Sequence, residues 1–517
     1  MSTRRPPQRI ALLAVVLTLV PILVLAGMPV YVRAEGAEPV PIYQTLEELA
    51  GKRFAYVNGS VYDQRVQAKI DGTSEDFYAS LPDCVAAVEA DKADAAVQIS
   101  YCCQLVVNRK NGTVALLPEY VDAIEEAYFF PKGSPLVDKF DQVIEKFEQD
   151  GTIEALTAKW VGTDESTKTL PKQDWPAPNG TLKFATSGVL EPFSYAGPGG
   201  KPTGYDVELA LLIAKELGYH LDVSAITMDA IFASVQAGKV DFGGTLTNTP
   251  ERAKMVDFTR QVMPCYIAVI VKAQGANAVD SSFFAGLAES FNRTFVEEKR
   301  WKLIASGLGV TALISVCSGV LGTLLGFATV LARRSGIRWL AKLVDYYQAL
   351  MGGVPLVVVL MVLYYVVFGS LDIAGELVAI LAFTLAFGAT SGSTMWTAVS
   401  GIDVIQEETG LALGYTSSEV FQKIIFPQAA QQFLPQLMGQ FVSLVKDTSI
   451  VGYIAVQDLT RASDLIRSRT MDAFFPLVAT AIIYFVVCRL LARILAKAVS
   501  RIDVTNKPRK VEGVVEQ

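Results

Sequence analysis

The stretch LIASGLGVTALISVCSGVLGTLLGFATVLA, residues 303–332, contains no charged side chain in 30 positions. Four further uncharged stretches follow it, at residues 354–371, 377–402, 426–445 and 473–488. A helix of about 20 apolar residues crosses a hydrocarbon core about 30 Å thick. The pattern therefore predicts an all-α domain over residues 301–500 with five membrane spans, of which 426–445, rich in Gln, Gly and Pro, is the most polar.

The composition of the whole chain indicates a membrane protein with a sizeable soluble part. Its 517 residues are 51% hydrophobic and 19% charged, and the net charge is −7. This length exceeds one domain, and the acidic balance argues against a nucleic-acid partner, since phosphates require basic surfaces. The single histidine, His220, excludes a His-rich metal site, so no metal or cofactor is expected.

Basic residues predict how the spans are oriented. Arg333 and Arg334 end the first stretch, and seven basic side chains follow the last: Arg489, Arg493, Lys497, Arg501, Lys507, Arg509 and Lys510. Lys and Arg collect on the cytoplasmic side of membrane proteins. We therefore expect a multi-pass protein of a cytoplasmic (plasma) membrane, with the region before residue 303 outside. The loop 403–432 and the tail 501–517 would be cytoplasmic.

The N-terminal segment, residues 1–34, has the layout of a secretory signal. Three arginines precede an apolar run over Ile10–Gly27, and Val32-Arg33-Ala34 is a candidate cleavage site. The apolar run is also nearly long enough to span a bilayer, so an uncleaved anchor is the alternative. Met28 stands where a lipoprotein signal requires Cys, so no lipid anchor is expected.

Residues 40–275 have the pattern of a soluble, mixed α/β region. Short β-branched runs such as Arg53–Val57 and Ala93–Val97 alternate with helical patterns such as Val137–Phe147 and Val207–Leu217. Strands that alternate with helices predict sheets with helices on their faces.

The cytoplasmic loop carries a spaced motif. It reads Glu408-Thr409-Gly410, three residues, Gly414, nine residues, and Ile424-Ile425-Phe426-Pro427. This resembles the coupling loop of ABC-importer permeases, Glu-Ala-Ala, three residues, Gly, nine residues, Ile-x-Leu-Pro. The resemblance implies a helix–turn–helix knob, with Glu408, Gly414, Ile424 and Pro427 at matching positions, that docks on a cytoplasmic ABC ATPase dimer. The alternative is an ordinary amphipathic connector.

Two shorter stretches also resemble the polar amino-acid permeases. Gly352–Leu356 is similar to their Arg-Gly-Thr-Pro-Leu, and Lys446–Ser449 to their Lys-Asp/Asn-Thr/Ser-Ser. The family's Arg in the first stretch is absent, and uncharged Gly392–Val399 replaces an Ala-Glu-x-x-Arg element. The resemblance covers about residues 300–500. Because Gly199-Gly200-Lys201 lacks the spacing of a phosphate-binding loop, ATP hydrolysis is expected from another chain.

Residues 181–272 resemble the first lobe of the amino-acid-type periplasmic binding proteins. The motifs occur in order: Glu191–Tyr195, Gly204–Leu209, Ala237–Asp241, Thr247–Arg252 and Asp257–Thr259. Residues 40–130 resemble the second lobe, through Leu46–Lys52, Asn58–Ser60 and Lys92–Ala95, and residues 131–162 resemble the C-terminal tail of that fold.

In the family lobe 1 precedes lobe 2, so the order here is reversed. Tandem binding proteins are the alternative, but every motif occurs once. We therefore predict one circularly permuted, two-lobed α/β module followed by the five-helix domain. Residues 163–180 would be a linker, and 273–300 a tether to the first span. Both module ends, near Pro41 and Lys272, are expected at the hinge between the lobes.

The resemblance assigns a ligand site between the lobes. Arg252 would hold the ligand carboxylate with a bidentate fork, assisted by Thr245 and Thr247, and Ser60 would complete the anion site or cap a helix. The family's acidic residues are replaced by Ile99, after Gln98, and by Ser187. Leu190 and Met228 stand where aromatic side chains are common, and Glu191 could replace the lost acids if it points inward.

Losing two carboxylates weakens the case for a cationic or α-amino ligand, because a buried ammonium group needs a partner. We expect a small carboxylate-bearing solute, most simply an amino acid. Cys84, Cys102 and Cys103 lie in one lobe, where they form either a disulfide or buried thiols.

The sequence thus predicts a binding protein fused to its permease in an ABC importer. It would work in the lipid bilayer with a second copy of itself and a separate ATPase, and no catalytic residue is assigned. A ligand-binding receptor or sensor and a ligand-gated channel are the alternatives. Fewer than 20 residues follow Val499, which is too few for a signalling domain.

Overall fold

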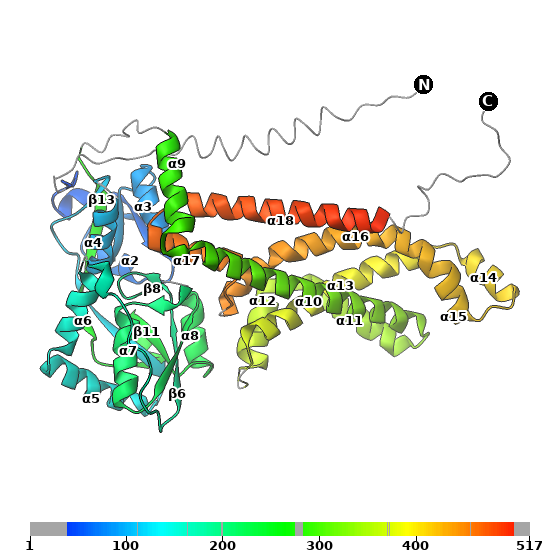
Figure 1. The fold of residues 1–517 in the computed structure, drawn as a ribbon, viewed down its shortest axis with the longest axis horizontal. Helices are drawn as coiled ribbons and strands as arrows, with labels where there is room; N and C mark the ends of the chain where they lie inside the picture. Colours follow the sequence, from blue (N-terminus) through cyan, green and yellow to red (C-terminus); the bar gives the residue numbers. More distant parts are fainter. Residues whose placement is uncertain are drawn as a thin grey trace. The chain divides into compact units, whose positions relative to one another are not determined.

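The computed structural model describes residues 39–500 except 111, 163, 198–199, 275–282, 370, 372 and 455. The predicted signal or anchor and the tail 501–517 therefore lie outside the described residues. The described chain divides into two units (Figure 1). One holds the α/β region together with residues 459–480, and the other holds most of the long helices.

The α/β unit has two lobes built on one continuous sheet of order β10-β6-β11-β5-β13-β3-β1-β2. Lobe 2 contains β1 (Arg53–Val57), β2 (Ser74–Tyr78), β3 (Ala95–Ile99) and β4 (Val114–Leu116). Its helices are η1 (Glu47–Leu49), α2 (Tyr62–Gln67), α3 (Leu81–Glu89) and α4 (Ser100–Arg109). Strand β1 runs parallel to β2 and β3, with Arg53 opposite Ser74.

Lobe 1 is built from β6 (Thr181–Thr186), β10 (His220–Ala225), β11 (Phe242–Thr247) and β12 (Val256–Phe258). Its helices are α5 (Leu136–Gln149), α6 (Thr152–Val161), α7 (Tyr205–Glu216), α8 (Met228–Gln236), η2 (Glu165–Thr167) and η4 (Arg252–Lys254). A small sheet of β7 (Val189–Leu190), β8 (Ser194–Ala196) and β9 (Pro202–Thr203) adjoins them. Aromatic residues fill the core, where the rings of Phe184 and Phe242 stack 4.7 Å apart.

Two strands cross between the lobes. Strand β5 (Ala123–Pro131) pairs with β11 and β12 in lobe 1, and β13 (Met263–Lys272) pairs with β3 and β4 in lobe 2. The two strands meet antiparallel between residues 123–126 and 263–266. This short pair is the hinge between the lobes.

The ends of the module lie side by side, but not at the hinge as expected. Ile42 N–H donates to the Lys272 carbonyl at 3.1 Å, and Gln274 N–H donates to the Val40 carbonyl at 2.7 Å. Lys272 also pairs with Val114 of β4, so this junction lies in the lobe 2 sheet. The reason is that β13 continues six residues beyond Tyr266 before it ends.

The segments expected as tail and linker both pack on lobe 1. Helix α6 contacts α7, where Lys159 and the Trp160 indole bind the Glu208 carboxylate at 2.6 and 2.7 Å. The predicted linker is held along β10, because Gln173 exchanges two hydrogen bonds with Leu221.

The segment from residue 283 to 300 forms α9 (Phe283–Phe291), η5 (Asn292–Val296) and η6 (Glu297–Lys299). Helix α17 (Leu459–Thr470) belongs to the α/β unit, although its sequence lies between two of the long helices.

The long helices are α10 (Trp301–Arg334), α11 (Arg338–Gly353), α13 (Gly375–Ser400), α16 (Phe426–Asp447) and α18 (Phe475–Ser500). Shorter segments connect them: α12 (Leu356–Met361), η7 (Val362–Val367), α14 (Val404–Ala412), α15 (Ser417–Val420), η8 (Phe421–Ile425) and η9 (Thr448–Ile454). Small residues allow close packing, since a Cβ on Gly326 of α10 would lie 2.8 Å from Gly392 N of α13.

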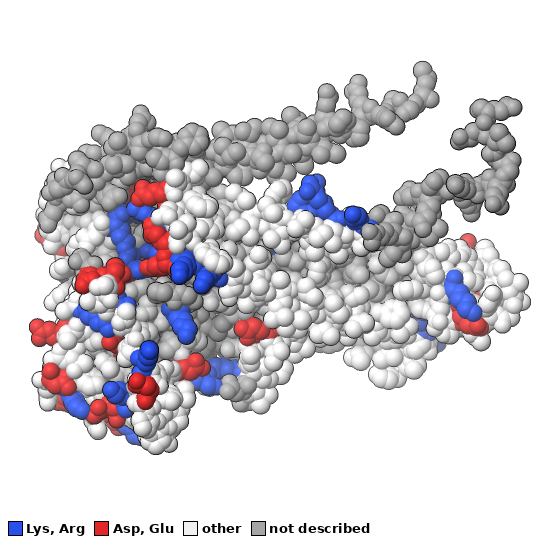
Figure 2. Space-filling model, in the orientation of Figure 1, with Lys and Arg blue, Asp and Glu red and all other residues white. Residues whose placement is uncertain are grey.

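Among the described residues three helices, α10, α13 and α18, are long and apolar enough to cross a membrane. The bent pair of α11 with α12 and η7, which turns by 107°, would make a fourth. Helix α16 is not among them, so the five-span prediction is not confirmed. Figure 2 shows charged side chains spread over the α/β unit, whereas the long helices are mostly uncharged on this face.

Candidate functional site

The carboxyl ends of parallel strands bring the predicted ligand residues toward one region. In lobe 1, β6, β10 and β11 are parallel, and they are followed by Ser187, Met228 and Arg252 respectively. In lobe 2, β1 is followed by Ser60, and Gln98 lies at the end of β3. Ligands of open α/β sheets bind outside such strand ends.

Arg252 joins the two lobes. Its guanidinium donates to the Thr247 carbonyl in lobe 1 at 3.0 Å and to the Gly59 carbonyl in lobe 2 at 2.9 Å. Burial lowers the pKa of Arg252, while the nearby Glu126 opposes that effect. The Arg252 fork therefore lies where the lobes meet, as a ligand-holding group requires.

Glu126, in the hinge strand β5, was not identified from the sequence. Only 2% of this residue is exposed, and it accepts a 2.5 Å hydrogen bond from the Thr247 hydroxyl. Burial is the largest effect on the pKa of Glu126, which is raised from 4.5 to about 7. The Thr247 hydrogen bond lowers this pKa, the Asp206 charge raises it, and the Arg252 charge lowers it. The feature of the sequence that could have indicated Glu126 is a carboxylate directly before the apolar run Ala127–Phe130.

Thr245 does not present its hydroxyl as a free donor for a ligand. The hydroxyl donates at 2.6 Å to Asp206 at the start of α7, and the Thr245 N–H reaches the same carboxylate at 3.3 Å. Burial raises the pKa of Asp206 to about 6, and both Thr245 bonds lower it. Thr245 therefore supports the packing of lobe 1.

The lobe 2 residues that were predicted to bind the ligand lie at the ends of strands, but their local contacts differ from those expected. Helix α2 begins after Val61, its N-cap residue, so Ser60 is not the helix cap. The Ser60 hydroxyl is buried and makes no hydrogen bond with another described residue. Gln98 is also buried, and its side-chain carbonyl accepts the Ile99 N–H at 3.0 Å.

Glu191 is buried and is bound by two arginines. Arg109 of lobe 2 contacts both Glu191 oxygens at 2.7 Å, and Arg469 of α17 contacts one at 2.6 Å. Glu191 thus links lobe 1 to lobe 2 and to α17. Its neighbour Leu190 and the distant Met228 are half-buried.

Helix α17 contacts the expected ligand wall and was missed by sequence reasoning. Arg461 donates to the carbonyls of Ser187, which is itself buried, and of Ile226, at 2.5 and 3.0 Å. Arg467 pairs with Asp83 of lobe 2. The signal available was three arginines in a 12-residue helical stretch between apolar segments.

All six cysteines are free thiols, and Cys84, Cys102 and Cys103 are buried. Burial raises the pKa of each of these three thiols. In the described ranges no group of three or more His, Cys, Asp or Glu side chains is arranged to hold a metal ion.

The predicted coupling loop forms two short helices joined by a turn. Helix α14 ends before the turn at Gly414, which has φ of +88°, and α15 begins with a capping box between Thr416 and Glu419. Glu408 is exposed and Ile424 half-buried, and Pro427 lies in the first turn of α16. Large apolar residues are exposed on and next to α14: Val404, Ile405, Leu411 and Leu413.

Comparisons with known proteins found similarity to binding proteins and to permeases. The family model "Bacterial extracellular solute-binding proteins, family 3" matches residues 182–451, just over half of the chain. The arginine ABC transporter permease protein ArtQ of Haemophilus influenzae is 33% identical over 189 residues, covering 34% of this chain and 83% of the relative.

Two further permeases are similar over most of their length. The L-cystine transport system permease protein TcyB of Bacillus subtilis is 29% identical, covering 40% of this chain and 90% of its own. The putative glutamine transport system permease protein GlnP of Rickettsia felis is 26% identical, covering 39% and 94%. A crystal structure of an amino acid ABC transporter with histidines is 28% identical, covers 38% and 94%, and has a TM-score of 0.37.

Proposed function

Because the chain belongs to the bacterial extracellular solute-binding proteins of family 3 and is similar to amino-acid permeases over most of their length, we propose that it both captures an amino acid and conducts it across the membrane. The chain is a subunit of an amino-acid ABC importer rather than a receptor or a channel. Its relatives are transport proteins and not enzymes. An ABC transporter works with an ATPase partner.

The observation that carries the binding role is the position of Arg252. Its fork lies at the carboxyl end of β11 and reaches across to the Gly59 carbonyl of lobe 2. A solute carboxylate would replace these carbonyl acceptors, because a carboxylate forms stronger, charge-assisted hydrogen bonds with a guanidinium. Closure of the lobes around the solute would then change how the module meets the permease.

A thermal-shift screen of the full chain in detergent tests this role. The screen contains L-cystine, L-arginine and L-glutamine, the solutes named for the relatives, with other amino acids, dicarboxylates and small amides. Arg252→Ala should abolish the shift, whereas Arg260→Ala, on an exposed arginine paired with glutamates, should retain it. An unchanged shift in Arg252→Ala would refute the carboxylate assignment.

The loop around Glu408–Pro427 is proposed to dock on the ATPase. Its support is the exposed apolar surface at Val404, Ile405 and Leu413, which water-exposed loops rarely display together. In the assembled importer, a homodimer would present two copies of the loop to the ATPase, one from each subunit. Co-purification with an ATPase and ATP-dependent uptake into vesicles test this, and native mass spectrometry counts the copies.

Circular permutation is proposed for the binding module. Its support is that residues 40–42 and 272–274 already hydrogen-bond to each other, so joining them would close the chain of a conventional two-lobed protein. The family match also begins at residue 182, in the first strand of lobe 1. A break within lobe 2 is tolerated because the chain is exposed at Val40 and Ile42, where one of the two ends lies.

A further inference from the structure

Helix α17 is polar in sequence and yet buried. It reads LTRASDLIRSRT over residues 459–470, and Arg461 and Arg467 are only 7% and 8% exposed. A guanidinium leaves water only where polar partners replace its hydration. The burial of this helix therefore depends on specific acceptors supplied by the two lobes.

One face of α17 lies against the lobe 1 wall that the sequence assigns to the ligand. Arg461, Leu465 and Arg469 share this face because they are four residues apart. Arg461 donates to the Ser187 and Ile226 carbonyls, which follow β6 and β10. A Cβ added to Gly188 would lie 3.4 Å from the Leu465 side chain, so the helix is in contact with the wall.

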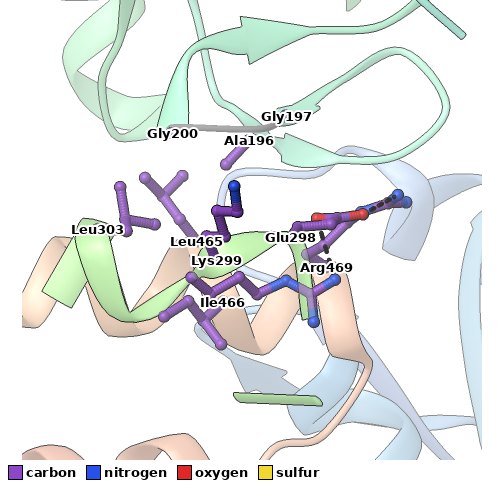
Figure 3. A pocket seen from close by; sticks show the side chains of 10 residues that line it. Ala196, Gly197, Gly200, Glu298, Lys299, Leu303, Leu465, Ile466 and Arg469 are labelled. Atoms are coloured by element: carbon purple, nitrogen blue, oxygen red, sulfur yellow. Dashed lines mark hydrogen bonds and ion pairs between the residues drawn. The ribbon is translucent and has the colours of Figure 1, made fainter. Parts of the chain in front are cut away.

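The C-terminal turn of α17 fastens the helix to both lobes. Arg469 binds Glu191 and Glu298, and its guanidinium lies 4.7 Å from the ring of Tyr195. Figure 3 shows the pocket beside this turn, with Leu465, Ile466 and Arg469 opposite Ala196 and Gly197. Nearby, Arg467 pairs with Asp83 of lobe 2.

These contacts use acceptors on the wall assigned to the solute. Because the family's acid at position 187 is replaced by Ser, the carbonyls of Ser187 and Ile226 are two acceptors that this wall offers to a solute ammonium or amide. Arg461 already occupies them. Each carbonyl has two lone pairs, but Arg461 and Leu465 lie against Ser187 and Gly188, so a solute that reaches these oxygens has to displace the helix.

We propose that α17 and the amino acid are alternative occupants of the lobe 1 wall. The proposal rests on the proposed function, since it assumes that the solute binds between the lobes. Docking of α17 would expel the amino acid from the wall, and binding of the amino acid would release the helix. The apparent affinity of the full chain is then lowered by the population of docked α17.

Crosslinking in the full chain, reconstituted in nanodiscs, tests the occupancy. Ala196→Cys combined with Leu465→Cys, which line the same pocket, should be joined by a short bis-methanethiosulfonate reagent, while Leu465→Cys alone should not. L-cystine, L-arginine and L-glutamine are then added in turn. An amino acid that binds should lower the crosslink yield several-fold. An unchanged yield with a bound amino acid, or no crosslink at all, would overturn the proposal.

A second measurement does not depend on the engineered cysteines. Arg461→Ala should lower the dissociation constant of the bound amino acid about tenfold, equivalent to about 1.4 kcal/mol, whereas Arg260→Ala should leave it unchanged. Equal affinity in Arg461→Ala and the unmodified chain contradicts competition. If the crosslink forms but no amino acid binds either chain, the proposed function fails while the placement of α17 stands.

Discussion

At the scale of single residues, Glu126 shows how the hinge sets the properties of the site. The side chain is buried beside the hinge pair and receives the Thr247 hydroxyl, while Arg252 lies close enough to favour its charged form. Burial outweighs these effects and raises the pKa of Glu126 to about 7. Its protonation state therefore changes near neutral pH, within the electrostatic influence of Arg252.

Replacement of Glu126 gives a pH-dependent prediction. Because the folded pKa is raised from 4.5 to about 7, the folded chain binds more protons than the unfolded chain between these values. The contribution of Glu126 to the free energy of unfolding is therefore fully present below pH 4.5, and it is lost as the pH rises to about 7. Glu126→Gln should remove that loss, which is at most about 3 kcal/mol.

The check is thermal unfolding of the full chain at pH 5 and pH 8, followed by tryptophan fluorescence. Glu126→Gln should raise the midpoint at pH 8 relative to the unmodified chain more than at pH 5. Glu125→Gln is the matched control, because the Glu125 side chain is next to Glu126 in the sequence but is exposed. The same gain at both pH values would contradict a titrating Glu126.

At the scale of elements, the coupling loop is packed more tightly than its exposed surface suggests. Gly410 of α14 is buried, and a Cβ there would lie 2.7 Å from a methyl group of Val420 in α15. The permease family has Ala in this part of the motif, whereas Gly410 here leaves room for the Val420 side chain. Arg334 at the end of α10 also pairs with Glu407 at 2.9 Å.

Gly410→Ala should therefore push α14 away from α15. Overpacking of this kind costs about 1–3 kcal/mol, so we expect a lower thermal midpoint and reduced ATP-dependent uptake. Gly410→Ala with Val420→Ala should restore both. Gly439→Ala serves as control, since nothing lies within 4 Å of a Cβ at that helical position. Full activity of Gly410→Ala would show that the two helices can separate without effect.

At the scale of the whole molecule, the distribution of charge predicts the membrane orientation. Arg333 and Arg334 end α10, and further basic residues follow α18, so we expect these ends in the cytoplasm. The binding module is then expected outside. Its attachment to the permease through residues 273–300 would keep it at a high local concentration.

A membrane-impermeant maleimide tests this orientation in spheroplasts. Glu251→Cys, exposed on the binding module, should be labelled in intact spheroplasts. Leu413→Cys, 72% exposed in the coupling loop, should be labelled only after the membrane is opened. Labelling of Leu413→Cys from outside would reverse the assigned topology.

Much of the architecture could be predicted because its signals are local. Uncharged runs indicated α10, α13 and α18, and ordered motifs indicated the two lobes. The span count could not be confirmed because α12 with η7 is bent sharply from α11 and α16 is too polar. Motif positions do not give side-chain directions, so the contacts of Thr245 with Asp206 were not foreseen.

The amino-acid sequence by itself determined the class of the protein, since hydrophobic length, charge placement and motif spacing are properties of neighbouring residues. Only the tertiary structure decided which groups meet. Glu191 and Arg469 are 278 positions apart, and Ser187 and Arg461 are 274 apart. Such pairs form because the folded chain returns α17 to the α/β unit, and no local pattern records that return.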